Sequence, residues 1–115
     1  MPHAPKSAAM EACIKACNDC AQSCLETHAH CLEMGGEHAS RGHITLLADC
    51  ADICATSVAF MGRGSELHGK VCAACAAVCE ACAKSCESMP GSDATMKRCA
   101  EACRKCAAEC RKMAA

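Results

Sequence analysis

The chain has 115 residues, a formal net charge of −1, 16 cysteines and a single aromatic residue outside histidine. This length allows one domain over 1–115, and the near-neutral charge argues against nucleic acid or an anionic membrane as a partner. No apolar run approaches the roughly 20 residues that cross a bilayer, and the start, MPHAPKSAAMEAC, lacks the apolar region of a secretory signal. We therefore expect a cytoplasmic protein whose thiols stay reduced.

Glycine and proline divide the chain into four predicted helices. After a flexible tail over 1–6, the helices are expected at roughly 7–34, 40–61, 66–89 and 93–113. Serines precede each of them as candidate N-caps, namely Ser7, Ser40, Ser65 and Ser92. Because short loops make neighbouring helices antiparallel, the sequence predicts an all-α fold, an up-down-up-down four-helix bundle with a cysteine-lined core.

One stripe, spaced alternately three and four residues apart, runs along all four predicted helices. Such positions face the axis of a bundle. The stripe consists of Met10, Cys13, Cys17, Cys20, Cys24, Thr27, Cys31 and Met34; His43, Leu47, Cys50, Cys54, Ser57 and Met61; His68, Cys72, Cys75, Cys79, Cys82, Cys86 and Met89; and Met96, Cys99, Cys103, Cys106, Cys110 and Met113. Every cysteine of the chain lies on it, so the predicted core is built mainly of sulfur.

Three uses of these cysteines other than metal binding are weaker. A bundle built only for stability would place leucine and isoleucine on the stripe. Disulfides within a helix are disfavoured, because Cβ atoms one turn apart lie about 5–6 Å from each other, beyond disulfide reach. A thiol oxidoreductase would place a CxxC motif at a helix start beside strands, whereas the CxxC motifs here fall inside helices without strands.

Metal binding fits the pattern, and charge favours Cu(I). Soft thiolate and thioether ligands select Cu(I), zinc or iron–sulfur clusters. A zinc ion in a four-cysteine site carries about −2, so filling the core with zinc would bury about −8 at high cost. One Cu(I) per thiolate gives a neutral array, and rows of thiols suit a chain of ions. A zinc or cadmium buffer remains the alternative, with a thiol oxidoreductase, a copper oxidase and a plain interaction bundle as further hypotheses.

The ends of the stripe carry methionine and histidine in place of cysteine. Antiparallel packing would gather Met10, Met61, His68 and Met113 at the end with the 62–65 loop, and Met34, His43, Met89 and Met96 at the other. Such neutral ligands could pass Cu(I) inward, or these methionines could simply plug the bundle. The predicted ligands beyond cysteine are His43, His68, Met61 and Met113. The histidines off the stripe are expected to be solvated (His28, His30 and His38) or to lie in the tail (His3).

The cysteine rows ACIKACNDCAQSC, CADICA, CAACAAVCEACAKSC and CAEACRKCAAEC, with the closing RKMAA, resemble the bacterial copper storage proteins, in particular their cytosolic branch. The likeness covers roughly Met10 to Ala115. It implies a bundle whose bore holds many Cu(I) ions, and a homotetramer. With the charge argument, we expect reversible Cu(I) storage or sequestration without catalysis, at about one ion per cysteine plus a few at methionine and histidine. The resemblance also implies copper held between CxxxC pairs: Cys13/Cys17, Cys20/Cys24, Cys50/Cys54, Cys75/Cys79, Cys82/Cys86, Cys99/Cys103 and Cys106/Cys110. Cys31 and Cys72 lack such a partner and would share copper across helices, or with His68 for Cys72.

Overall fold

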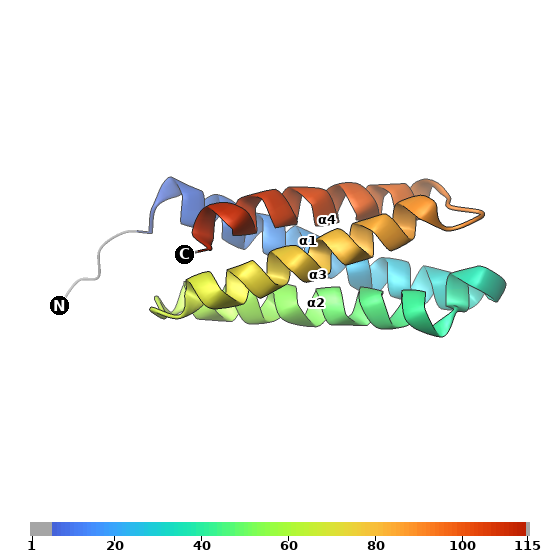
Figure 1. Cartoon of the computed structure of the whole chain (residues 1–115), viewed down its shortest axis with the longest axis horizontal. Coiled ribbons are helices and arrows are strands. Elements are labelled where there is room, and N and C mark those ends of the chain that lie inside the picture. The colour runs from blue at the N-terminus through green and yellow to red at the C-terminus, as the bar shows by residue number, and fades with distance from the viewer. Residues whose placement is uncertain (1–5, 115) are drawn as a thin grey trace.

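Four antiparallel helices form the fold in the computed structural model, which describes residues 6–114 (Figure 1). They are α1 (Ala8–Met34), α2 (Arg41–Gly62), α3 (His68–Ser88) and α4 (Ala94–Met113), with a short 3-10 helix η1 (Gly36–Ala39) between α1 and α2. These bounds confirm the four predicted helices to within two residues. The expected tail, including His3, lies outside the described residues except for Lys6.

The helices form a long square bundle of about 54 × 20 × 19 Å. Each helix packs against its neighbours in the chain, and α1 also packs against α4. Over residues 6–114, no Cα atoms of the diagonal pairs α1–α3 and α2–α4 approach within 8 Å. The diagonal helices are therefore separated by the side chains that fill the axis of the bundle.

The helix starts agree with the predicted serine caps only in part. The hydroxyl of Ser7 accepts the Met10 N–H at 3.0 Å and caps α1. Ser40 is the N-cap residue of α2, although its side chain makes no capping bond. The predictions for Ser65 and Ser92 were wrong, since α3 begins after Leu67 and α4 is capped by Asp93. A carboxylate suits that position because it accepts the Met96 N–H at 3.0 Å and carries a negative charge at the positive end of the helix.

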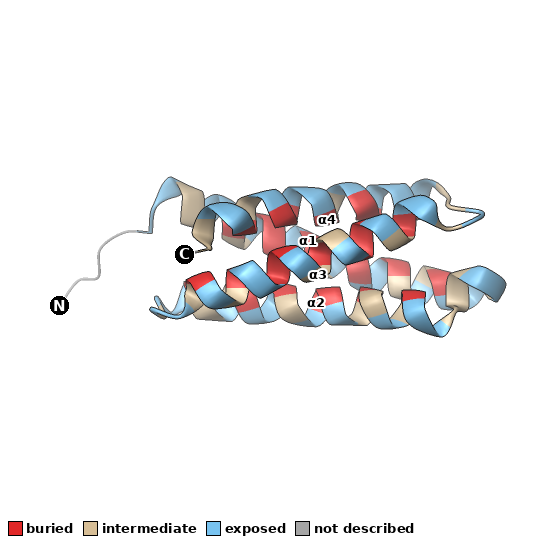
Figure 2. Cartoon of the chain, viewed as in Figure 1, coloured by how far each residue is buried: buried red, intermediate tan, exposed pale blue. Residues whose placement is uncertain are grey.

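The predicted stripe forms the core. All sixteen cysteines are fully buried, as are Leu47, Met61 and Met96, and the buried segments face inward along each helix (Figure 2). Small alanines such as Ala51 and Ala83 are buried beside them. The prediction that Met34 faces the axis was wrong, because Met34 is the last residue of α1 and its side chain is 54% exposed.

Helix α2 is more apolar than the sequence analysis allowed. By length and composition it could cross a membrane, with an 18-residue window of mean hydropathy 1.6. The expectation that no segment approaches this threshold was therefore wrong. Alanine and cysteine raise the hydropathy of this helix, and one third of the window is buried inside the bundle, including Cys50 and Cys54.

Candidate metal centre

The sixteen cysteine side chains form a continuous column of sulfur atoms along the bundle axis, here called the thiol column. Its closest contacts join different helices: Cys50 and Cys79 Sγ atoms lie 3.5 Å apart, and so do those of Cys17 and Cys106. Cys54 is a hub, with its Sγ 3.7 Å from the Sγ atoms of Cys75, Cys79 and Cys106. Neighbouring helices thus bring their sulfur atoms into direct contact, and the contact of Cys54 with Cys106 joins the diagonal helices α2 and α4.

Within the column, thiols converge in sets of four whose Sγ atoms all lie within 4.8 Å of one another. Such sets, ordered from the α3–α4 connection toward the end of α4, include Cys24/Cys82/Cys99/Cys103, Cys20/Cys24/Cys50/Cys103, Cys20/Cys50/Cys54/Cys79, Cys54/Cys75/Cys79/Cys106 and Cys17/Cys75/Cys106/Cys110. Each set consists of one CxxxC pair and one thiol from each of the two adjacent helices. The structure thereby brings together five of the seven pairs that the resemblance implied.

The order of these sets follows a rule that spacing alone did not reveal. Successive sets share two cysteines; the first two, for example, share Cys24 and Cys103. The helix that supplies the CxxxC pair changes from α4 to α1, α2, α3 and back to α4, so the pairs wind around the axis. A metal in one set is therefore always next to a site with which it shares ligands.

The thiols of the column are free, and their contacts with one another shift their pKa values in both directions. Burial is the main cause that raises the pKa of the Cys31 and Cys72 thiols to about 11; the Asp93 charge contributes at Cys31, and the Cys13 thiolate contributes at Cys72. In the middle of the column, a hydrogen bond with Cys103 holds the pKa of Cys50 well below its ordinary value. The contacts of Cys103 with Cys20 and Cys24 hold its own pKa well above. A metal entering this network must replace protons.

One end of the bundle, here called the termini end, carries the α2–α3 connection, the start of α1 and the end of α4 (Figure 1). Met10, Met61, His68 and Met113 all lie at this end, as predicted; Met61 is fully buried and the other three are half-buried. The Nδ1–H of His68 donates to the Ser65 carbonyl at 2.8 Å. Because a carbonyl only accepts, this bond leaves the lone pair on Nε2, the form in which imidazole binds metal.

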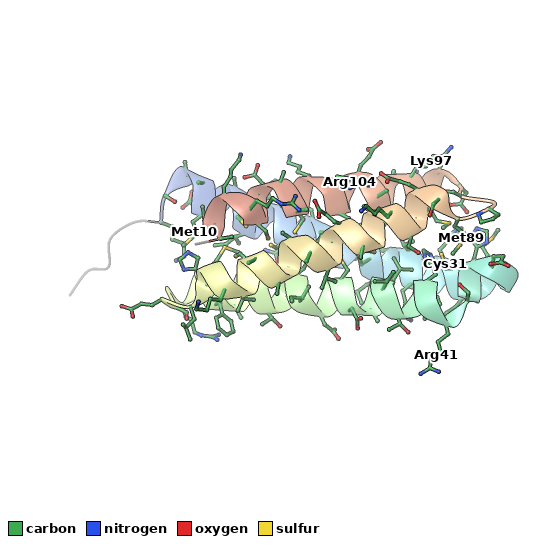
Figure 3. All side chains as sticks on the ribbon, viewed as in Figure 1. Met10, Cys31, Arg41, Met89, Lys97 and Arg104 are labelled. Atoms are coloured by element: carbon green, nitrogen blue, oxygen red, sulfur yellow. The ribbon has the colours of Figure 1, made fainter. Side chains whose placement is uncertain are left out.

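The opposite end, here called the loop end, carries the 35–40 and 89–93 connections, with Cys31 and Met89 labelled there in Figure 3. His43 is 3% exposed, and its Nε2 lies 3.4 Å from the Cys31 Sγ. Its Nδ1 lies 2.7 Å from the Ser85 hydroxyl, which orients the ring. Burial lowers the pKa of His43 and keeps the ring neutral. Cys31 thus has a specific imidazole partner, which the sequence analysis missed although both residues lie on the stripe at the ends of neighbouring helices.

The histidines expected to be solvated are only partly so. His28 is half-buried, the His38 side chain is 12% exposed, and that of His30 is 29% exposed. His30 Nε2 lies 2.7 Å from Asp93 Oδ2, and His38 Nε2 lies 3.1 Å from the Gly91 carbonyl oxygen. The prediction for His30 and His38 was wrong, because both rings pack against the α3–α4 connection.

Residues 6–115 match the family of copper storage proteins. The chain belongs to this family. Among solved structures, the Nmul_A1745 protein of Nitrosospira multiformis is 50% identical, with a TM-score of 0.86 over 92% of this chain and 94% of that one. The Cu(I)-bound copper storage protein BsCsp3 is 42% identical, with a TM-score of 0.86 over 93% and 99% of the two chains.

Two relatives from Bacillus subtilis extend the comparison. The apo form of copper storage protein 3 is 44% identical, with a TM-score of 0.80 over 91% of this chain and 98% of that one. An uncharacterized cysteine-rich protein, YhjQ of strain 168, is 44% identical over 66 residues. That match spans 57% of this family member and 61% of YhjQ. The family and the fold predicted from the cysteine rows are both confirmed.

Proposed function

We propose that this chain stores or sequesters Cu(I) on the thiolates of the thiol column, at about one ion per cysteine, in the cytoplasm and without catalysis. The observation that carries the proposal is the chain of four-thiol sets in which neighbours share two cysteines. The sixteen cysteines are the proposed principal ligands. Family membership and the Cu(I)-bound state of the similar BsCsp3 support copper storage. The free cysteines support a cytoplasmic location, because thiols stay reduced in that compartment.

The sulfur spacing is compatible with bound metal after small movements. With metal–sulfur bonds of about 2.3 Å, two ligands stand about 4.6 Å apart in a linear unit and about 4.0 Å apart in a trigonal one. The contacts in the column run from 3.5 Å between Cys50 and Cys79 to 4.0 Å between Cys106 and Cys110. Side-chain rotations that open these contacts by about 1 Å or less are therefore sufficient.

Charge selects the metal among those that thiolates bind. Each Cu(I) that replaces a thiol proton leaves the fully buried column neutral, whereas zinc in four-thiolate sites accumulates negative charge, and no lysine or arginine among residues 6–114 is buried to offset it. Shared cysteines such as Cys54 and Cys79 can bridge two ions. Bridging also lets an ion move to the next set while one of its ligands stays bound.

The ends of the column supply weaker, neutral ligands. We infer that Met61, Met113 and His68, with Met10 beside them, form the entrance at the termini end, since three of the four are half-buried and His68 presents Nε2. His43 would complete a site with Cys31 at the loop end. Leu25 and Leu32 on α1 are more than half exposed. Their exposure is consistent with a homotetramer, which the family resemblance implies.

An anaerobic titration with Cu(I) against a chromogenic chelator tests the proposal. We expect the chain to outcompete the chelator until about one ion is bound per cysteine, with protons released as the metal displaces them from thiols that are still protonated. Saturation at four ions or fewer would overturn the proposal. A zinc or cadmium buffer predicts that Zn(II) displaces bound Cu(I), and a thiol oxidoreductase predicts turnover in place of graded uptake.

A further inference from the structure

A second group of metal-ligating side chains lies at the loop end, outside the thiol column. It consists of His30 on α1, His38 on η1 and Asp93 before α4. His30 Nε2 lies 2.7 Å and His38 Nε2 3.9 Å from the same oxygen, Asp93 Oδ2. The His30 and His38 rings are nearly perpendicular in a T-shaped arrangement, with their centroids 6.4 Å apart. Three donors from three segments of the chain therefore converge on one point.

The fold holds these donors in place. Asp93 uses Oδ1 to cap α4, which fixes its carboxylate and leaves Oδ2 facing the histidines. His38 lies over Gly91, where a Cβ atom would come within 3.2 Å of the ring carbon Cε1. Gly91 also has a φ of +79°, a conformation that favours glycine. The close approach of η1 to the α3–α4 connection thus depends on the residue type at position 91.

The donor set differs in chemistry from the thiol column. Two imidazole nitrogens and one carboxylate oxygen suit divalent cations such as Zn(II), Co(II), Ni(II) and Cu(II), because the carboxylate is a hard ligand that matches them better than the soft Cu(I) ion. Bonds of about 2.0–2.2 Å around a tetrahedral ion place two donors about 3.3–3.5 Å apart. The two distances to Asp93 Oδ2, 2.7 Å from His30 Nε2 and 3.9 Å from His38 Nε2, lie on either side of this value. Shifts of about 0.6 Å would satisfy both ligands.

We propose that His30, His38 and Asp93 bind one divalent first-row transition-metal cation, in addition to the copper of the column. The cation takes the place of the Nε2 proton that His30 donates to Asp93 and of the one that His38 donates to the Gly91 carbonyl. In each neutral ring the proton moves to Nδ1, so that Nε2 presents its lone pair to the metal. Both Asp93 and His30 are about 30% exposed, so an ion can reach the site and solvent can supply a fourth ligand. Binding would join the end of α1 to η1 and to the start of α4.

Cobalt provides a direct test because its spectrum reports its ligands. Protein saturated with Cu(I) under anaerobic conditions is titrated with Co(II), so that the thiols are already occupied. We expect one Co(II) per chain, with visible ligand-field absorption and no sulfur-to-cobalt charge-transfer band. A band from sulfur ligation, or no binding at millimolar Co(II), would overturn the proposal. In the copper-free protein, X-ray absorption should show one nitrogen- and oxygen-coordinated Co(II) in addition to any cobalt that the free thiols bind, which keeps this test separate from the fate of copper storage.

Three variants assign the site. His38→Ala removes one ligand, and Asp93→Asn removes the charge while retaining a side chain that caps helices well. We expect each to weaken Co(II) binding at least about tenfold while Cu(I) capacity and helical circular dichroism stay unchanged. His28→Ala is the matched control, since His28 lies on the same helix as His30 and makes no side-chain hydrogen bond within residues 6–114. Equal Co(II) binding by wild type, His38→Ala and Asp93→Asn would overturn the assignment.

Discussion

The two ends of the bundle are closed in different ways. At the loop end, hydrogen bonds join α1 and η1 to the α3–α4 connection, from His30 to Asp93 and from His38 to the Gly91 carbonyl. At the termini end, the hydrogen bonds of the α2–α3 connection stay within it, as those of Ser65 with Phe60 and with His68 do. In the described part of the chain, none of them reaches α1 or α4.

This contrast indicates where copper passes. Opening the loop end requires breaking bonds between segments, and His43 and Met96 are buried beneath them. Opening the termini end requires only rotation of flexible side chains, because Met10 and Met113 are half-buried and unbranched. We therefore expect Cu(I) to enter and leave at the termini end, with the loop end serving as the closed base of the column.

The largest expected effect comes from changing the proposed entrance at the termini end, which should alter the rate of Cu(I) loading. His68→Ala removes the imidazole at the termini end whose free Nε2 can bind an arriving ion. We expect Cu(I) uptake from a chelator, followed by stopped-flow absorbance, to slow about tenfold, the order of effect seen when metal sites lose supporting groups. Total capacity should fall by no more than about one ion, because the sixteen thiols remain.

The matched control for the loading experiment is His38→Ala, which removes a half-buried histidine from the opposite end. It should leave the uptake rate at the wild-type value. If His38→Ala slowed uptake as much as His68→Ala did, copper would not distinguish the two ends and the assignment of the entrance would fail. Slowing by His38→Ala alone would reverse the assignment.

The contrast between the ends also shows what the sequence could predict. The alternating spacing of cysteines placed residues such as Cys50 and Cys103 on the axis, because helical periodicity determines which side chains share a face. It could not determine the rotation and register of one helix against another, which decide that Cys31 meets His43. Nor could it place His30 and His38, whose partners belong to a connection more than fifty residues away in the chain.

A second prediction concerns the side of the column nearest the termini end, where α2 carries Ser57 in place of a cysteine. The Ser57 hydroxyl is fully buried and has no hydrogen-bond partner among the described residues. Because an unpaired buried hydroxyl is destabilising, Ser57→Ala should raise the free energy of unfolding of the copper-free protein by about 1 kcal/mol, measured by urea denaturation. Ser57→Cys should stabilise similarly and also raise Cu(I) capacity by about one ion.

Ser57→Ala serves as the control for Ser57→Cys in the capacity measurement, because both remove the hydroxyl but only the cysteine adds a Cu(I) ligand. Equal capacity in Ser57→Cys and wild type would show that the column does not extend toward the termini end at this position. A loss of stability in Ser57→Ala would show that the hydroxyl binds an ordered water molecule whose removal is costly.

The smallest expected effect distinguishes the thiols nearest the two ends. Burial raises the pKa of both Cys31 and Cys72 from an ordinary value of 9.0 to about 11, and the next contribution comes from Asp93 for Cys31 and from Cys13 for Cys72. A raised pKa in the folded state means that the unfolded chain ionises first. The stability of the copper-free protein should therefore hold below pH 9 and fall as the pH rises from 9 toward 11.

Asp93→Asn should distinguish the titration of Cys31 from that of Cys72 between pH 9 and 11. Removing the carboxylate charge should lower the pKa of Cys31, followed through the ¹³Cβ shift in the copper-free protein, and leave the pKa of Cys72 at the other end unchanged. The alkaline loss of stability should then become slightly smaller, because one of the two thiols ionises more readily in the folded state. An equal change at Cys31 and Cys72 would mean that the substitution acts on the whole bundle. Only a change confined to Cys31 would show that the carboxylate at the closed end tunes the thiol beside it.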